Sequence, residues 1–102
     1  MKVNFSDVPL ALIETKRAGE TRLPVGAIKS ARRKLTVLRA APDERTLLSW
    51  KSLHYKKLEG VREGQRSIRL NDQFRMVMAL NSEANALTAT ILNIEEYANG
   101  EN

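Results

Sequence analysis

The hydrophobic pattern changes its period at Pro42, and this change constrains the fold more than any other feature of the sequence. Before Pro42, apolar residues recur at helical spacing and predict an amphipathic helix over residues 23–41. Its apolar stripe consists of Ile28, Ala31, Leu35 and Leu38. After Pro42, short runs with strand-like alternation are separated by turn residues. The chain is therefore expected to place its helices first and most of its sheet second.

Two further elements are predicted before this helix. Residues 2–5 alternate polar and apolar side chains, which is typical of a short strand. Residues 7–18 predict a helix with Ser6 or Asp7 as its N-cap and Gly19 as its C-terminal cap. This helix and the one over residues 23–41 are expected to form a helical hairpin.

The second half of the chain predicts an antiparallel meander. Its strands are expected at residues 53–58, 66–70, 74–80 and 86–94, with tight turns at residues 71–73 and 81–85. The predicted fold class is therefore α+β: a two-helix hairpin packed on one face of a mainly antiparallel sheet, in the order β-α-α-β-β-β with one further strand. The 102 residues are expected to form a single domain.

Charge is distributed unevenly along the chain. Residues 16–75 hold 16 of the 17 Lys and Arg residues and six of the 12 acidic residues, whereas residues 76–102 hold four Glu and no basic residue. A basic body with an acidic end favours binding to a polyanion or to an acidic protein partner. Solubility alone also accounts for a net charge of +5.

Several site types are excluded or disfavoured by composition. The chain has no cysteine and one histidine, which excludes disulfides and a thiol nucleophile and disfavours a transition-metal site. No cofactor is indicated. No stretch reaches the roughly 18 apolar residues of a membrane span, and no signal-peptide pattern begins the chain, so we expect a cytoplasmic protein without a membrane partner.

Strand parity predicts a basic face on the sheet. If Met76 and Met78 face the helices, Arg75 and its counterpart Arg69 on the preceding strand share the opposite face. His54 has the parity of Lys56 in the strand before. Such a set suits RNA cleavage without a metal, because guanidinium groups stabilise a phosphate and a His or Lys can transfer protons.

Residues 58–75 resemble the HigB branch of the RelE/ParE toxin superfamily. The shared elements are Leu58-x-Gly60-x-Arg62-x-Gly64, then Ser67-Ile68-Arg69, then Asn71-x-x-Phe74-Arg75, and the acidic-acidic-tyrosine end Glu95-Glu96-Tyr97. The close match covers about a fifth of the chain, and the order of elements extends it to nearly all.

The resemblance implies the toxin of a type II toxin–antitoxin pair. Such toxins are ribosome-dependent mRNA endonucleases that cleave the codon in the A site of the 30S subunit, and they inhibit translation and growth. The implied partners are a HigA-like helix-turn-helix antitoxin, the ribosome and mRNA, with operator DNA reached only through the antitoxin complex. Such pairs also serve plasmid maintenance.

The resemblance assigns roles to individual residues. Arg75 matches the arginine that contacts the scissile phosphate, Arg69 matches a basic position of the RelE branch, and Glu96 and Tyr97 match the C-terminal catalytic cluster. Ala98 replaces a family histidine, and another family histidine falls on Lys56, so either His54 or Lys56 is left as the proton-transfer group. The RNA- and ribosome-binding candidates are Lys57, Arg62 and Arg66.

Ordinary structural interpretations also fit several of these residues. His54 also fits a surface histidine, Tyr97 a packing residue at a strand end, and Lys57 and Arg62 solvated rim charges. Two other functions remain open: a ParE-type inhibitor of DNA gyrase, and a catalytically inactive RNA-binding module, which the loss of the histidine at Ala98 favours.

Overall fold

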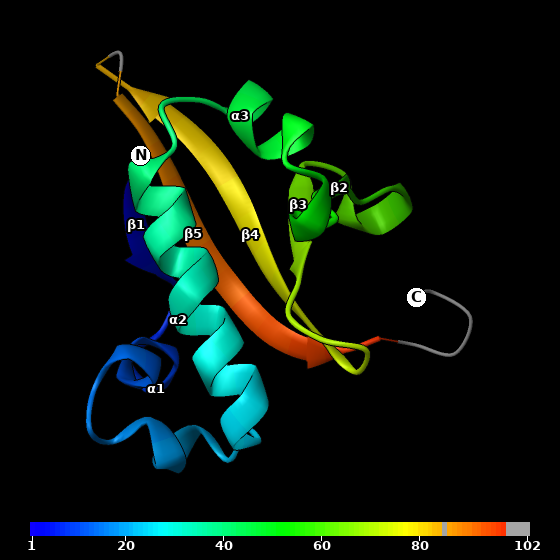
Figure 1. Ribbon diagram of the computed structural model, residues 1–102. Helices are drawn as coiled ribbons and strands as arrows, with labels where there is room; N and C mark the ends of the chain where they lie inside the picture. The colour runs from blue at the N-terminus through cyan, green and yellow to red at the C-terminus, as the bar shows by residue number, and fades with distance from the viewer. Residues whose placement is uncertain (85, 98–102) are drawn as a thin grey trace.

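The structure, a computed structural model that describes residues 1–84 and 86–97, contains one five-stranded sheet with helix α2 (Val25–Ala40) across one face (Figure 1). The strands are β1 (Lys2–Phe5), β2 (Lys56–Lys57), β3 (Gln65–Arg69), β4 (Phe74–Glu83) and β5 (Ala86–Glu96). They lie in the order β1-β5-β4-β3-β2. Strand β1 is parallel to β5 and the other neighbours are antiparallel. The predicted α+β class and mainly antiparallel sheet are confirmed.

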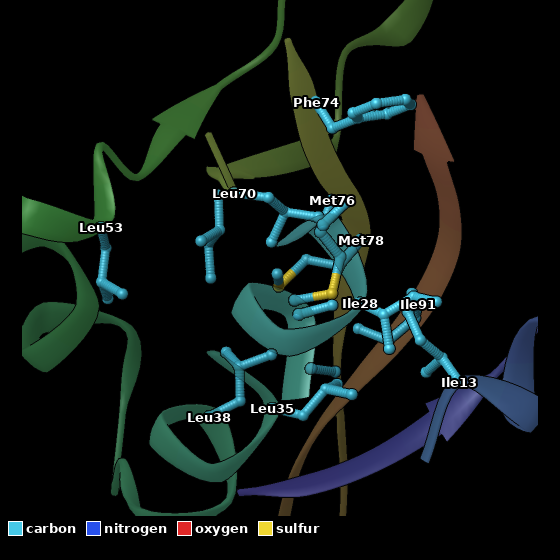
Figure 2. Close-up of a cluster of buried hydrophobic side chains, with 14 of the residues drawn as sticks. Ile13, Ile28, Leu35, Leu38, Leu53, Leu70, Phe74, Met76, Met78 and Ile91 are labelled. Carbon is cyan, nitrogen blue, oxygen red and sulfur yellow. The ribbon is translucent and has the colours of Figure 1, made fainter. Parts of the chain in front are cut away.

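The apolar stripe of α2 forms one wall of the core. Leu35 and Leu38 are fully buried, as predicted from their spacing. Met76 and Met78 on β4 are also fully buried, and Figure 2 shows these side chains gathered in one cluster between helix and sheet. Burying a side chain of this size stabilises the fold by about 1.5–3 kcal/mol. The core thus fixes which face of β4 points toward α2.

The helix predicted over residues 7–18 is shorter than expected. Helix α1 covers Val8–Ala11 and begins at Asp7, whose carboxylate accepts a hydrogen bond from the Leu10 N–H at 2.8 Å. Two 3-10 turns follow, at Leu12–Glu14 and Ala18–Thr21. Thr15 separates them, because its hydroxyl accepts from the Arg17 N–H at 3.0 Å and its backbone is extended. Such a local side-chain bond competes with helix propagation.

The strand predicted over residues 53–58 is also wrong in part. Helix α3 (Glu44–Ser49) and a 3-10 turn (Lys51–Leu53) precede it, and only β2 pairs with the sheet. Leu53 is buried in the core, and His54 ends the turn with a left-handed φ of 48°. His54 therefore does not share a strand face with Lys56, and the parity argument does not apply to it.

The remaining strands follow the prediction closely. Residues 71–73 form the expected tight turn, in which the Asn71 side-chain oxygen accepts from the N–H groups of Gln73 and Phe74 at 2.9 and 2.8 Å. Strand β4 runs on to Glu83, so the second turn is shorter than residues 81–85, and residue 85 lies outside the described residues. Within the described part of the chain, no helix is long and apolar enough to cross a membrane.

Candidate functional site

The two predicted arginines lie opposite each other on neighbouring strands. Arg69 of β3 is the register partner of Arg75 of β4, and directly paired residues point to the same face of a sheet. Their neighbours Ile68 and Met76 are fully buried in the core on the α2 side. Arg69 and Arg75 therefore face away from α2, which confirms the predicted geometry.

Arg75 is held on two sides in this position. It is 4% exposed, and its Nε and Nη2 atoms donate to Oε2 of Glu95 at 3.2 and 2.9 Å. Its guanidinium carbon lies 5.4 Å from the centre of the Tyr97 ring, within the range of a cation–π contact. A buried guanidinium needs such partners because removing it from water is costly. The orientation of Arg75 is thus set by its neighbours on the sheet.

Glu95 joins Arg75 to a second arginine. Nη1 and Nη2 of Arg62 donate to Oε2 and Oε1 of Glu95, both at 2.8 Å, which is a bidentate pair. The hydrogen bonds from Arg62 and then from Arg75 lower the pKa of Glu95 from its ordinary 4.5 to about 2, against the opposing effect of burial. Glu95 is therefore a carboxylate at neutral pH and a poor general base.

A β-bulge places Glu95 in this position. Val77 pairs with Asn93 while Met78 pairs with Ile91, so Leu92 is an extra residue on β5. Without this shift, Ile94 would stand opposite Arg75. The bulge also explains how Ile91 and Ile94, three residues apart, both contact the core. Sequence reasoning chose Glu96 and missed Glu95; the apolar spacing of Ile91 and Ile94 is the signal that would have revealed the bulge.

A depression of about 270 Å³ opens beside these residues. It is lined by Lys56, Lys57, Leu58, Glu59, Arg62 and Arg75. Lys56 pairs with Ser67, which pairs with Val77, so Lys56 is on the same face as Arg75. The predicted Lys56, Lys57, Arg62 and Arg75 thus come together around one concave surface, and its basic side chains suit an anionic group.

Arg69 stands at the end of the β3–β4 hairpin. It forms an ion pair with Asp72, and its Nε donates to the Asn71 carbonyl at 3.3 Å. Its side chain is 30% exposed, far more than that of Arg75 at 5%. The Arg69 side chain is therefore the more accessible of the two, and it lies outside the lining of the depression.

Two of the predicted catalytic residues lie apart from this group. His54 is an exposed residue at the end of its turn and does not line the depression. Glu96 pairs in register with Phe74, on the side opposite to Arg75, and its Oε1 accepts from Gln73 Nε2 at 3.2 Å. The position of Ala98 lies outside the described residues. Glu95, and not Glu96, supplies the carboxylate at Arg75.

Arg66 belongs to a different charged cluster. Its Nε donates to Oε2 of Glu44 at 2.8 Å, and the Tyr55 hydroxyl donates to the same oxygen at 2.6 Å. Burial and the Glu44 contact raise the pKa of Tyr55, while the hydrogen bond from Tyr55 lowers that of Glu44. Arg66 pairs with Met78, so it lies on the α2 side of the sheet. It lines a second depression, of about 560 Å³, together with Lys57.

The described residues contain no group of three or more His, Asp or Glu side chains placed to hold a metal ion. The available chemistry is that of guanidinium and ammonium groups around one surface, with a carboxylate and a tyrosine that hold Arg75. Such groups bind a phosphate and stabilise negative charge that develops on it.

Solved structures share this fold at low sequence identity. A YoeB/ParE toxin from Agrobacterium tumefaciens is 15% identical, with 96% of this chain and 100% of that chain covered and a TM-score of 0.64. YafQ from E. coli strain BL21(DE3) is 10% identical, with coverages of 93% and 91% and a TM-score of 0.64. The YoeB–YefM complex from Staphylococcus aureus is 15% identical, with 96% of this chain and 98% of that chain covered and a TM-score of 0.53.

Comparison of the sequence itself is less informative. No protein-family model matches the chain, and no curated protein matches it. At the identities of the solved structures, the likeness demonstrates shared architecture. The chain has the RelE/YoeB-like toxin fold.

Proposed function

We propose that this protein is the toxin of a type II toxin–antitoxin pair, a ribosome-dependent, metal-independent mRNA endoribonuclease of the HigB type. The observation that carries the proposal is the register pairing of Arg69 with Arg75 on the face turned away from α2, where Arg75, Lys56 and Arg62 line one depression. The fold shared with a YoeB/ParE toxin and the HigB-like elements over residues 58–75 support it.

In the proposed reaction, the 2′-oxygen attacks the adjacent phosphorus as its proton leaves. The bond from phosphorus to the 5′-oxygen breaks as that oxygen takes up a proton. Arg75 and Arg69 stabilise the charge that gathers on the phosphate. Lys56 lines the depression and His54 does not, which supports Lys56 as the group that transfers a proton.

The HigA-like antitoxin is proposed as the partner that neutralises the toxin. The same fold occurs in the YoeB–YefM complex, which supports a toxin of this shape acting within a protein complex. The basic stretch over residues 16–75 supports an acidic antitoxin segment as the group that covers it. The proposed place of action is the cytoplasm, at the ribosome.

The function is tested by expressing wild type, Arg75→Ala and Arg39→Ala without antitoxin. Arg39 is the matched control, because it also forms a bidentate pair with a glutamate, Glu14, but does not line the site. We expect wild type and Arg39→Ala to arrest growth and to cleave mRNA on translating ribosomes. Arg75→Ala should lower cleavage by about 10²–10³-fold, the usual effect of removing one donor of this kind.

Growth arrest by Arg75→Ala equal to that of wild type would show that the site is wrong. The other functions give different products. A gyrase inhibitor would leave mRNA intact and trap gyrase–DNA complexes, and an inactive binding module would produce neither cleaved mRNA ends nor trapped complexes. Free RNA is a poor substrate for this test, because the proposed enzyme relies on the ribosome to position the codon.

A further inference from the structure

Glu95 bonds to two arginines that come from different elements of the fold. Arg62 comes from the 3-10 turn Gly60–Arg62, and Arg75 from the start of the central strand β4. Both donate to Oε2 of Glu95, at 2.8 Å from Arg62 and 2.9 Å from Arg75. Two guanidinium groups repel each other, so the carboxylate between them is what allows both to stand at the same surface.

This contact links the turn that carries Arg62 to the sheet. Gly60 at the start of the turn and Gly64 after it have positive φ values of 69° and 93°, a backbone conformation that favours glycine. Val61 at its tip is fully exposed and gives the turn no apolar anchor. Besides Glu95, the Arg62 side chain bonds to Gln65 through Nε at 3.2 Å. The bidentate ion pair with Glu95 therefore links Arg62 directly to strand β5.

Two different residues contact the Arg75 guanidinium. Glu95 accepts from Nε and Nη2, and the guanidinium carbon lies over the Tyr97 ring, 5.4 Å from its centre. These two contacts restrict the orientation of the guanidinium, and preorganised donors stabilise a transition state without having to rearrange. The bulge at Leu92 shifts the register of β5 and so places Glu95 opposite Arg75.

We propose that Glu95 is a positioning residue of the nuclease: it fixes Arg75 and Arg62 together at the depression, so that one phosphate meets both. This inference rests on the proposed function. Glu95 acts through the arginines and does not itself take a proton from the substrate.

The test measures single-turnover cleavage of mRNA on programmed ribosomes over a range of toxin concentrations. We compare wild type with Glu95→Gln, Glu95→Asp and Glu14→Gln, the last of which breaks the bidentate Glu14–Arg39 pair outside the site. Glu95→Gln should lower the maximal rate by about 10- to 100-fold, as for a misplaced catalytic group, with a smaller change in half-saturating concentration. Glu95→Asp should recover part of the rate, and Glu14→Gln should retain it.

A double variant separates positioning from a direct role. In an Arg75→Lys background, which retains charge but loses the bidentate fork, Glu95→Gln should cause a smaller further loss than in wild type, because only its effect through Arg62 remains. A further loss as large as in the wild-type background would overturn the inference. So would a maximal rate of Glu95→Gln equal to that of wild type.

A measurement without substrate keeps the inference apart from the proposed function. In the intact protein, the NMR signal of the Arg75 Nε–H should exchange slowly with water, and in Glu95→Gln or Glu95→Asp it should exchange faster. Unchanged exchange in both variants would overturn the positioning role even if wild type cleaves mRNA. Absence of cleavage by wild type together with faster exchange would refute the nuclease function and leave the structural role of Glu95 intact.

Discussion

Replacement of Glu95 by glutamine should destabilise the protein in a pH-dependent way. The pKa of Glu95 falls from 4.5 to about 2 on folding, because Arg62 and Arg75 bond to its carboxylate. This lowering corresponds to about 3 kcal/mol of unfolding free energy at neutral pH. The side chain is 21% exposed, so solvent screens the interaction only in part.

The direction with pH follows from the lowered value. A carboxylate whose pKa is lower in the folded state stabilises the fold above its unfolded pKa, and this stabilisation is lost as pH falls through the folded value. The contribution of Glu95 is therefore complete above about pH 5 and falls to about 1 kcal/mol near pH 3. Glu95→Gln lacks it at every pH.

The assay is urea unfolding of wild type and Glu95→Gln at pH 7 and pH 3. The difference in unfolding free energy between the two proteins should be about 3 kcal/mol at pH 7 and about 1 kcal/mol at pH 3. Glu96→Gln is the matched control, since Glu96 is exposed and lies on the other face, and it should stay within about 0.5 kcal/mol of wild type. A gap that is absent at pH 7, or equal at both pH values, would refute the reasoning.

Three further outcomes are expected. Ile68→Ala, at a fully buried position, should cost about 2–5 kcal/mol in urea unfolding, and a loss below about 1 kcal/mol would contradict the assigned core. Glu44→Gln should lower the free energy of unfolding by about 1–3 kcal/mol. It should also bring the pKa of Tyr55 down toward its ordinary value in an absorbance titration, and an unchanged titration would contradict the Tyr55–Glu44 contact. Association of the toxin with its proposed antitoxin, followed by calorimetry, should weaken as salt is raised, whereas a constant Kd would speak against an acidic segment on the basic residues.

The elements that could be predicted from the sequence are those that a repeating apolar pattern determines. The stripe on α2 and the alternation around Met76 specify one buried face each, and the strands β3 and β4 join through a tight turn with Asn71 at its start. Together they were sufficient to place Arg69 and Arg75 on one face, because parity and a short hairpin leave little freedom in register.

The errors arise where a local interaction overrides the pattern. Thr15 bonds to the backbone beside it and separates two 3-10 turns, where the apolar spacing would continue a helix. Leu53 turns into the core at the end of a 3-10 turn, and His54 takes a left-handed conformation that no strand pattern indicates. The histidine therefore lies outside the strand whose parity was used to place it.

The β-bulge accounts for the one site residue that was missed. Parity along β5 from the buried Ile91 would place Glu95 toward the core, and only the extra residue Leu92 reverses this. A bulge depends on tertiary pairing as much as on local sequence. Here the carbonyl of Leu92 accepts a hydrogen bond at 3.2 Å from the hydroxyl of Ser6, which is distant in the sequence. A site that depends on a register shift is thus harder to predict than one that depends on alternation.

The charge separation along the sequence has a different meaning in three dimensions. Within the described part of the acidic end, Glu95 is not on a separate surface, because β5 lies beside β4 and Glu95 stands directly opposite Arg75. Part of the basic charge is therefore neutralised within the site, in a form that orders two guanidinium groups. A net charge taken from composition describes long-range attraction to a polyanion, whereas the arrangement around Glu95 determines how a single phosphate would be held.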